Sequence, residues 1–289
     1  MEKTIMTGDF LIGSRFVYGM RTPNWIGIPY TDIGIFIPSL RFPRFKDPQV
    51  GDVLIFNYPR DKYVKYVKRC IAGPGDTLLI ENKQVYLNGD LTKLPENYVF
   101  SQPEVPKTMK QKAIYLSSEL NINKDNMGPI IIPKKGDYFK IDKNTNWREL
   151  LPIMMMEGNK AELRGNEKTF IFTLQDPFEL DRRKNHPSVF EPYFGYGNGN
   201  LITPWSRQIL DNHFQYLVIN GKSITDWEGY EVKQNYYWAM GDNRDDSLDS
   251  RYWGLVPENF VLGEALFAYF SLDLRSWIPR FNRIGKIID

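Results

Sequence analysis

The chain has 289 residues, 42% hydrophobic and 25% charged side chains, and a formal net charge of +2, values typical of a globular protein with one large domain or two modest ones. So small a net charge gives no reason to expect nucleic-acid binding. The single cysteine excludes an internal disulfide, and the two histidines argue against a histidine-based triad or a histidine-rich zinc site, so we expect no metal and no cofactor.

Residue patterning in the first third of the chain predicts β-structure. Loose alternation of polar and apolar residues indicates a strand over residues 9–18, and β-rich stretches follow at 52–58 and 63–72. Residues 84–89 end in Asn-Gly, which is a strong hairpin signal. Residues 20–48 are rich in Pro, Gly and aromatic side chains, and they predict a loop with exposed apolar groups.

The middle of the chain differs in composition from its two ends. Between residues 93 and 213, Lys and Asn become frequent. Residues 146–156 and 176–184 are compatible with short helices, although Pro152 would interrupt the first of them. Strand-like patterning returns at residues 260–270.

This order of elements predicts a mainly β protein with an antiparallel-sheet core. Residues 1–92 and 214–289 would form that core together, and residues 93–213 would be an inserted α+β subdomain. No uninterrupted apolar run in the sequence reaches the roughly 18–20 residues that cross a bilayer.

The most informative stretch is the polar run at residues 240–254. It holds four carboxylates, two arginines and two serines without helical or strand periodicity. Tyr252 and Trp253 close the run and can anchor it to a core, which argues against a flexible linker. A half-buried polar loop is costly unless its charges satisfy one another, and such loops most often support a functional site.

Residues 241–251 resemble the last signature box of the type I signal peptidases. That box reads Gly-Asp-Asn-Arg-x-x-Ser-x-Asp-Ser-Arg, and the match is complete, so it is far more specific than a short motif. Residues 66–76 look like the family's lysine box with one glycine shifted by a position, and residues 51–56 look like its strand box. Residues 8–12 with 18–19 resemble the end of its serine box. The resemblance covers both ends of the chain and implies the family's β core.

The resemblance implies a nucleophilic serine directly before Met1. The family's serine box reads Ser-Met-x-x-Thr and is followed by Gly-Asp, and this sequence begins at the methionine of that box. Lys3 stands where many members have proline, and Ser14 lies beyond the Gly-Asp pair and does not fit. The alternatives are a gene-model error or fragment that removed the serine and the upstream membrane span, or a true short form. We favour the first, because Lys68 and the 241–251 run are intact.

The activity implied by the resemblance is serine-lysine peptide hydrolysis that removes N-terminal signal peptides, with Lys68 as general base. A lysine is a base only when neutral, and burial among apolar groups lowers its pKa. The neighbours of Lys68 in sequence are apolar enough for this: Tyr66, Val67, Cys70 and Ile71. Without the surrounding box, an exposed strand lysine such as Lys65 would be the commoner interpretation.

Five residues of the last box are expected to support Lys68. By resemblance, Ser247 hydrogen-bonds the lysine amine and orients it. We expect Asp242 to pair with Arg244 and Asp249 to pair with Arg251, so that two ion pairs hold the loop. If these charges are buried, removal of one partner would leave the other uncompensated.

The expected partners are the signal peptides of secretory preproteins and a membrane surface. The resemblance places the catalytic domain on the extracytoplasmic side of the cell membrane. The apolar loop at residues 20–48 either rests on lipid or folds over the core, and the sequence supports both equally. A catalytically inactive relative that binds extended peptides is the main alternative function. A self-cleaving serine-lysine regulator is disfavoured by the complete 241–251 run and by the lack of a DNA-binding element.

Overall fold

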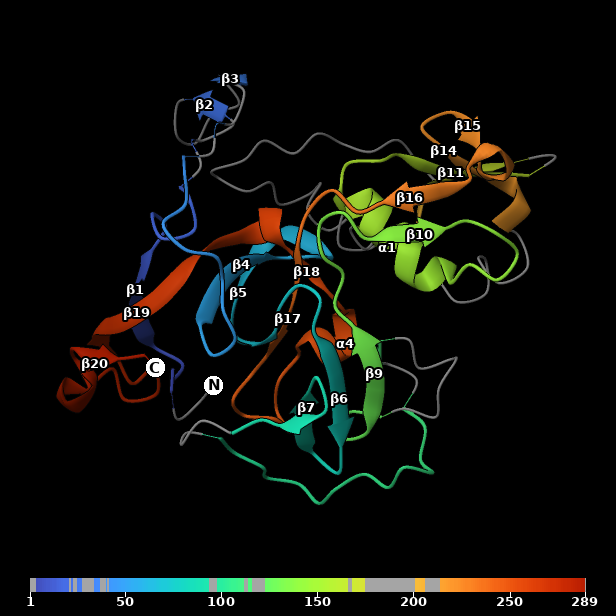
Figure 1. The fold of residues 1–289 in the computed structure, drawn as a ribbon. Helices are drawn as coiled ribbons and strands as arrows, with labels where there is room; N and C mark the ends of the chain where they lie inside the picture. The colour runs from blue at the N-terminus through green and yellow to red at the C-terminus, as the bar shows by residue number, and fades with distance from the viewer. Residues whose placement is uncertain are drawn as a thin grey trace.

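A computed structural model describes residues 4–20, 22, 25–27, 34–36, 40, 42–93, 98–111, 114–115, 123–165, 168–174, 201–205 and 214–288. The described residues form a mainly β fold with antiparallel sheets, as predicted (Figure 1). None of the helices in these residues is both long and apolar enough to cross a bilayer.

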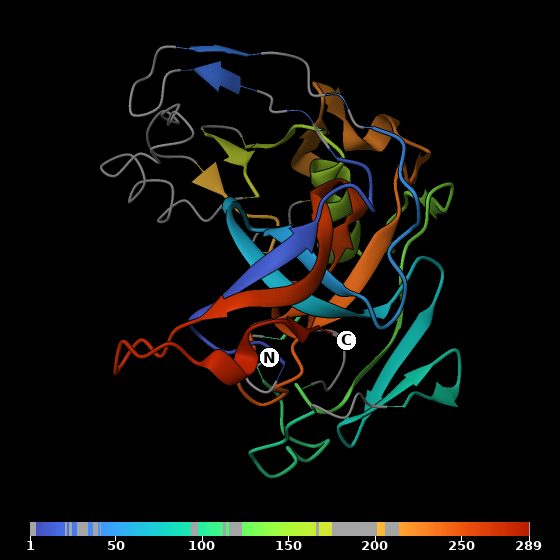
Figure 2. The same ribbon diagram turned by 90° about the vertical axis from the view of Figure 1, so that its left-hand side faces the viewer.

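The largest sheet has seven strands drawn from both ends of the chain. Its order is β1-β19-β4-β5-β17-β18, with β20 paired to β19, and all these pairings are antiparallel. The strands are β1 (Asp9–Ser14), β4 (Val53–Tyr58), β5 (Asp61–Ala72), β17 (Tyr236–Met240), β18 (Val256–Pro257), β19 (Val261–Ser271) and β20 (Lys286–Ile287). Figure 2 shows β1 lying along β19, with the C-terminal segment projecting from one end of the sheet.

A second sheet of four strands, ordered β8-β7-β6-β9, lies next along the chain. Its strands are β6 (Thr77–Glu81), β7 (Gln84–Leu87), β8 (Asp90–Leu91) and β9 (Met127–Ile131). The predicted Asn-Gly hairpin is confirmed, because Leu87 pairs with Asp90 and the intervening Asn88 and Gly89 have φ of 55° and 94°. Positive φ at both central residues is what a type I′ turn requires.

The remaining elements form a smaller α+β unit and short connections. A five-stranded sheet is ordered β13-β12-β11-β14-β15, and separate two-stranded sheets pair β10 with β16 and β2 with β3. Their bounds are β2 (Trp25–Gly27), β3 (Gly34–Phe36), β10 (Tyr138–Lys140), β11 (Ala161–Arg164), β12 (Thr169–Phe172), β13 (Leu201–Ile202), β14 (Leu217–Ile219), β15 (Lys222–Ser223) and β16 (Gly229–Glu231). The helices are α1 (Trp147–Met156), α4 (Ser250–Trp253) and the 3₁₀ turns η1 (Phe214–Tyr216), η2 (Ile224–Asp226), η3 (Glu258–Phe260) and η4 (Phe281–Arg283).

Two expectations about local structure need correction. Pro152 does not interrupt its helix, because α1 runs through it and buries eight of its ten residues; tertiary packing of that helix outweighs the hydrogen bond that proline removes. Within the predicted loop at residues 20–48, β2 and β3 pair as a short hairpin, as aromatic and β-branched residues favour. The second expected helix, at residues 176–184, lies outside the described residues.

The core has two main parts. One buried cluster joins α1, the second sheet and β17, and it includes Leu150, Leu78 and Trp238. The other packs β4, β5 and β17 against α4, and Trp253 of α4 lies there, almost fully buried. Burial on both sides of β17 fixes the strand that leads directly into residues 241–251.

Candidate active site

Lys68 lies in the middle of β5 and faces the loop that follows β17. Strand pairing places Arg69 opposite Met240, so Gly241 leaves the sheet beside Lys68. The Nζ of Lys68 donates a hydrogen bond of 2.8 Å to the Oγ of Ser247, which is 179 residues away in the sequence. The predicted proximity of these two side chains is therefore confirmed, and it brings an amine and a hydroxyl together at a half-buried position.

Gly241 forms the floor under this contact. A Cβ on Gly241 would lie 2.2 Å from the Oγ of Ser247 and 3.5 Å from the Nζ of Lys68. Real Cβ atoms do not approach other atoms as closely as the first of these distances, so any larger residue would displace Ser247. From the residue pattern alone, only the place of Gly241 in the box indicated that a glycine is needed here.

The environment of Lys68 favours its neutral form. Burial lowers the pKa of Lys68 below the ordinary lysine value, and the Arg251 guanidinium acts in the same direction. The Asp249, Asp242 and Asp246 carboxylates oppose this effect without cancelling it. A lowered pKa increases the fraction of the amine that is neutral, and the neutral amine is the form that can accept a proton.

Asp249 and Arg251 form the ion pair expected of them. Arg251 donates from Nε and Nη2 to the two carboxylate oxygens of Asp249, each at 2.9 Å, and both side chains are buried. Burial alone would raise the pKa of Asp249, but Arg251 outweighs it and holds that pKa below its usual range. Asp249 also accepts a hydrogen bond of 3.2 Å from the backbone N–H of Gly241, which closes the loop at its base.

The expected pairing of Asp242 with Arg244 is wrong. Asp242 pairs instead with Arg69, whose Nε and Nη2 each donate to it at 2.9 Å. The hydroxyl of Thr4 donates to the same carboxylate at 2.6 Å. The reason is the register of β17 on β5, which sets Arg69 next to the first residues of the loop. Arg69 and Thr4 both lie outside residues 241–251, so spacing within that run could not identify them as partners of the loop.

Arg244 takes a different role from the one expected. Its guanidinium lies over the ring of Tyr98 at 4.1 Å, and the side chain is buried. Its Nε has no hydrogen-bond partner among the residues that the structure describes. Burial and the neighbouring Arg251 lower the pKa of Arg244 well below its ordinary value. The contact with Tyr98 is of the cation–π type, which stabilises a desolvated guanidinium.

The other expectations about reactive groups concern the N-terminus, the cysteine and metals. Met1 lies outside the described residues, so the implied serine directly before it, which would have to reach Lys68, stays a prediction. Cys70 is buried, and that burial raises the pKa of its thiol, which makes a thiolate nucleophile unfavourable. Among the described residues, no group of three or more His, Cys, Asp or Glu side chains could hold a metal ion.

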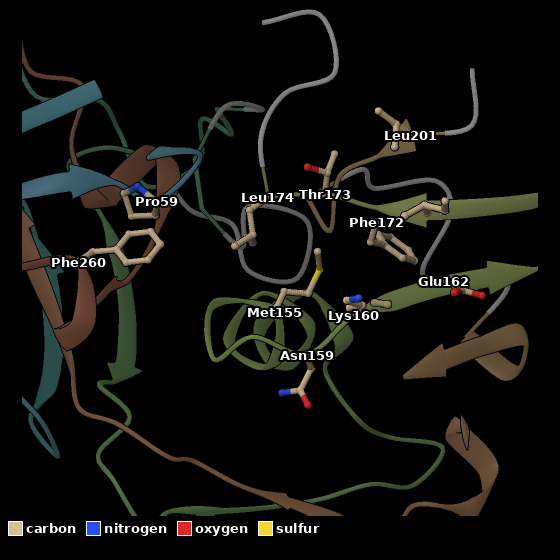
Figure 3. Close-up of a pocket in the computed structure, with 12 residues that line it drawn as sticks. Pro59, Met155, Asn159, Lys160, Glu162, Phe172, Thr173, Leu174, Leu201 and Phe260 are labelled. Atoms are coloured by element: carbon tan, nitrogen blue, oxygen red, sulfur yellow. The ribbon is translucent and has the colours of Figure 1, made fainter. Parts of the chain in front are cut away.

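A separate pocket of about 470 Å³ lies near the turn between β4 and β5, between the main sheet and the α+β unit. Pro59 contributes from the turn between β4 and β5 and Phe260 from η3, and Met155 and Phe172 contribute from α1 and β12 (Figure 3). None of the candidate catalytic residues lines it.

Comparison with known proteins places the chain in a family. A sequence model of "Signal peptidase, peptidase S26" matches residues 1–146 and 180–270. The signal peptidase I of Buchnera aphidicola subsp. Baizongia pistaciae is 26% identical over 292 residues, which cover 99% of this chain and 73% of that protein. The signal peptidase I of Pseudomonas aeruginosa is 23% identical over 300 residues, which cover 99% of this chain and 68% of that protein.

A solved structure of a signal peptidase I from Enterococcus faecalis V583 aligns with a TM-score of 0.26 and 16% identity, covering 76% of this chain and 97% of that chain. So low a score carries no argument, and the assignment rests on the sequence matches. Because the family model covers well over half of the residues, the chain belongs to the signal peptidase family, peptidase S26.

Proposed function

We propose that this protein is a signal peptidase I, a serine endopeptidase that removes signal peptides from secretory preproteins, with Lys68 as its general base. The observation that carries the proposal is the 2.8 Å contact between the Nζ of Lys68 and the Oγ of Ser247. A serine hydroxyl is a weak nucleophile until a base takes its proton, and an oriented neutral lysine can do so.

In this mechanism the nucleophile is a serine directly before Met1. Lys68 would take the proton from that hydroxyl as its oxygen attacks the scissile carbonyl, and would return the proton to the leaving amine. Ser247 would hold the amine in place, while Asp242, Arg244, Asp249 and Arg251 would fix the loop that carries Ser247. The family resemblance implies that the backbone N–H of the serine and an upstream hydroxyl stabilise the oxyanion.

The position of Thr4 supports this placement. Thr4 is buried, and it is tied to Asp242 through its hydroxyl and to Arg283 through its carbonyl oxygen. Asp242 directly follows Gly241, which underlies Ser247 and Lys68. Four residues of extended chain reach about 14 Å, so a serine four positions before Thr4 would lie within range of Lys68.

The expected substrate is an extended peptide with small residues before the cut, as in the Ala-x-Ala pattern of secretory signals. An extended chain binds by adding to an exposed strand edge, and shallow apolar pockets select small side chains. We also propose that residues 1–92 and 214–289 carry this site as one catalytic core, with residues 93–213 inserted. The main sheet supports the division, since its strands come only from residues 9–72 and 236–287.

We further propose that the C-terminal segment meets the membrane surface on the extracytoplasmic side. Trp277 and Phe281 are 74% and 75% exposed. Together with nearby exposed apolar residues they form what we call the C-terminal patch: Leu274, Trp277, Ile278, Phe281, Ile284 and Ile287. Exposed patches of this kind mark interaction sites, and aromatic side chains favour the lipid–water interface.

Binding to phospholipid vesicles tests the membrane proposal. A Trp277→Ser/Phe281→Ser double variant is expected to lose most of its vesicle binding in a sedimentation assay. Leu91→Ser is the matched control, because Leu91 is also exposed but lies on β8, outside the patch. Equal binding by the double variant and the control would contradict the proposed surface.

The catalytic proposal is tested in a chain that is extended upstream with the serine and the membrane segment implied by the resemblance. Cleavage of a signal-peptide substrate is expected to appear, and both Lys68→Ala and Lys68→Arg should abolish it, because an arginine does not deprotonate in a protein. Ser247→Ala should leave a weakened enzyme, slower by about tenfold, since it removes one orienting hydrogen bond and leaves the base.

Three outcomes would decide against this mechanism. Substantial cleavage by Lys68→Arg would exclude lysine as the base. Cleavage that survives Lys68→Ala would require another nucleophile or base. Peptide binding without any cleavage by the extended chain would favour the inactive relative.

A further inference from the structure

Asp245 belongs to the loop that carries Ser247, but neither the family box nor the mechanism above gives it a role. Its carboxylate is fully buried. One oxygen accepts hydrogen bonds from the backbone N–H groups of Ser101 and Gln102, at 2.8 and 2.9 Å. The ammonium groups of Lys83 and Lys124 contact the same carboxylate, with Lys83 at 3.0 and 3.1 Å from its two oxygens. Four donors thus converge on one side chain.

These contacts lower the pKa of the Asp245 carboxyl group strongly. Burial alone would raise the pKa of Asp245, but the hydrogen bonds from Lys124, Gln102 and Lys83 outweigh burial and hold that pKa well below the usual range. Asp245 is therefore ionised at every pH at which a protease of this kind would work. A buried carboxylate with complete hydrogen bonding is a fixed anchor and not a titrating group.

Lys124 contacts the loop at two points. Its side chain contacts Asp245, and its backbone carbonyl accepts a hydrogen bond of 3.3 Å from the Nη1 of Arg251. Asp245 and Arg251 flank Ser247 in the sequence, two residues before it and four residues after it. One residue from outside the loop therefore holds both sides of the segment that carries the hydroxyl.

The backbone beside Asp245 is held by a second segment from residues 98–102. Val99 and Asn243 form a parallel β-bridge. The N–H of Val99 donates to the carbonyl of Asp242 at 3.1 Å, and the N–H of Arg244 donates to the carbonyl of Val99 at 3.0 Å. Residues 242–245 are thus hydrogen-bonded to residues 98–102. The last of these contacts along the loop are those of the Asp245 carboxylate with Ser101 and Gln102.

Ser247 lies beyond these contacts, at the tip of the loop. Its neighbours Asp246 and Leu248 are exposed, so the tip itself is not held by a core. The bond between Asp249 and the N–H of Gly241 closes the loop on one side of the tip. Asp245 is the anchor on the other side, and two fixed points so close together leave the hydroxyl little freedom.

We propose that Asp245, held by Lys83 and Lys124, is a positioning residue that keeps the Oγ of Ser247 against the amine of Lys68. This inference rests on the proposed function, because positioning matters only if Lys68 is the base. Residues 83, 98–102 and 124 would then help to maintain the geometry of the catalytic site. Misplacement of a reacting group by about 1 Å can cost a hundredfold in rate.

The test variant is Asp245→Asn, which keeps the size of the side chain and removes its charge. Glu157→Gln is the matched control, because the Glu157 carboxylate also accepts from four groups: the hydroxyls of Tyr230 and Tyr236 and the backbone N–H of Lys233 and Gln234. Glu157 follows α1 and belongs to no part of the proposed catalytic machinery. Asp245→Asn is expected to lose more thermal stability than Glu157→Gln, because Lys83 and Lys124 lose a carboxylate partner, so the kinetics are compared at a temperature at which both variants are fully folded.

In the extended enzyme, Asp245→Asn is expected to lower kcat by about ten- to a hundredfold with KM changed little, while Glu157→Gln keeps both. Lys124→Arg, which retains the charge, should preserve more activity than Lys124→Met. A folded Asp245→Asn enzyme with the kcat of the parent would overturn the proposal. So would an equal loss of kcat in Glu157→Gln, because the effect would then be one of general stability.

A second readout does not depend on cleavage and uses the chain as its sequence stands. The acylation rate of each lysine amine is measured with acetic anhydride and mass spectrometry. Release of the Lys68 amine from Ser247 should change its rate by a similar factor in Asp245→Asn and in Ser247→Ala, and Glu157→Gln should leave it unchanged. A change in Ser247→Ala alone would overturn the positioning role. Failure of Lys68→Ala to abolish cleavage would instead refute the general-base assignment and leave this structural readout standing.

Discussion

At the scale of single residues, Lys68 and Ser247 can make their contact only because residue 241 is a glycine and has no Cβ atom. The hydroxyl of Ser247 occupies the space that a Cβ at position 241 would need. A glycine in this loop is therefore required by packing around the site, and its backbone does not need a positive φ. This distinguishes it from the turn glycines of the molecule, such as Gly89 at φ 94°.

Gly241→Ala is expected to lower the cleavage rate of the extended enzyme by about tenfold or more, because the added methyl group must move Ser247 away from the amine. Gly73→Ala is the control, since a Cβ there would meet only one oxygen of Asp76, at an ordinary 3.6 Å. Rates are measured at saturating substrate. Equal rates for the two variants would show that Ser247 accommodates the methyl group and still orients Lys68.

The sequence predicted some of these residue contacts and not others, for a physical reason. Asp249 and Arg251 were predicted correctly as a pair, since both oxygens and both nitrogens meet within one short turn. The pairing of Asp242 with Arg244 was wrong, because Asp242 finds its arginine 173 residues away on β5. Spacing within a short segment cannot predict an ion-pair partner that lies on a distant strand and is brought close by strand pairing.

At the scale of elements, the ion pair between Arg69 and Asp242 joins β5 to the loop after β17. Both side chains are buried, with relative exposures of 4% and 1%. Thr4 adds the N-terminal segment to the same carboxylate. The element that carries the base, the loop that carries Ser247 and the segment next to the proposed nucleophile thus share one anchor.

Asp242→Asn is expected to destabilise the fold by about 3–5 kcal/mol, because Arg69 is buried and would lose the carboxylate charge that it contacts through two nitrogens. Glu162→Gln is the control, since Glu162 pairs with Arg164 at 3.1 Å on the surface, with exposures of 35% and 52%, and such pairs contribute at most about 1 kcal/mol. Urea denaturation compares the free energies of unfolding. A cost for Asp242→Asn no larger than that of the control would mean that solvent reaches Arg69 readily.

Elements with strong local signals were predicted well. The Asn-Gly turn at residues 88–89 was predicted and closes the hairpin of β7 and β8. The structure has another Asn-Gly turn of this kind, Asn220-Gly221, between β14 and β15, with Ile219 opposite Lys222. Helix α1 was placed correctly, but its continuation through Pro152 depends on burial that no local pattern reveals. Patterning describes a segment alone, whereas the packing of α1 is a property of the assembled core.

At the scale of the whole molecule, the sheets cross the expected domain boundaries. The main sheet contains only strands from the two ends of the chain, but β9 pairs with β6 and β11 pairs with β14. Strands on both sides of residues 92 and 213 therefore share hydrogen bonds. The division at those residues stays a prediction, because composition changes along a sequence do not reveal which strands will pair across it.

The buried amine of Lys68 lowers the free energy of unfolding of the whole protein at neutral pH. Its pKa is lowered in the folded protein, chiefly by burial, so between the folded and unfolded pKa values the unfolded chain binds more protons. Stability linked to this group is therefore complete above the unfolded value near 10.5, and it decreases as the pH falls toward the folded value. At neutral pH the folded protein is therefore less stable than it would be without this amine, whose lowered pKa is what allows it to act as a base.

Lys68→Met is accordingly expected to raise the melting temperature at neutral pH while it abolishes cleavage, because it keeps an unbranched side chain and removes the buried ionisable amine. The gain over the parent protein should shrink as the pH rises toward 10.5, the ordinary pKa of lysine, where the parent no longer gains from unfolding and protonating Lys68. Lys65→Met is the control, since Lys65 is exposed on the same strand and its substitution removes a lysine amine that is not buried. Melting temperatures of the three proteins are measured from pH 6 to 10.5. A gain for Lys68→Met that stayed constant over this range would mean that the amine is as well solvated in the fold as in the unfolded chain, and the physical basis for a lysine general base at this position would be lost.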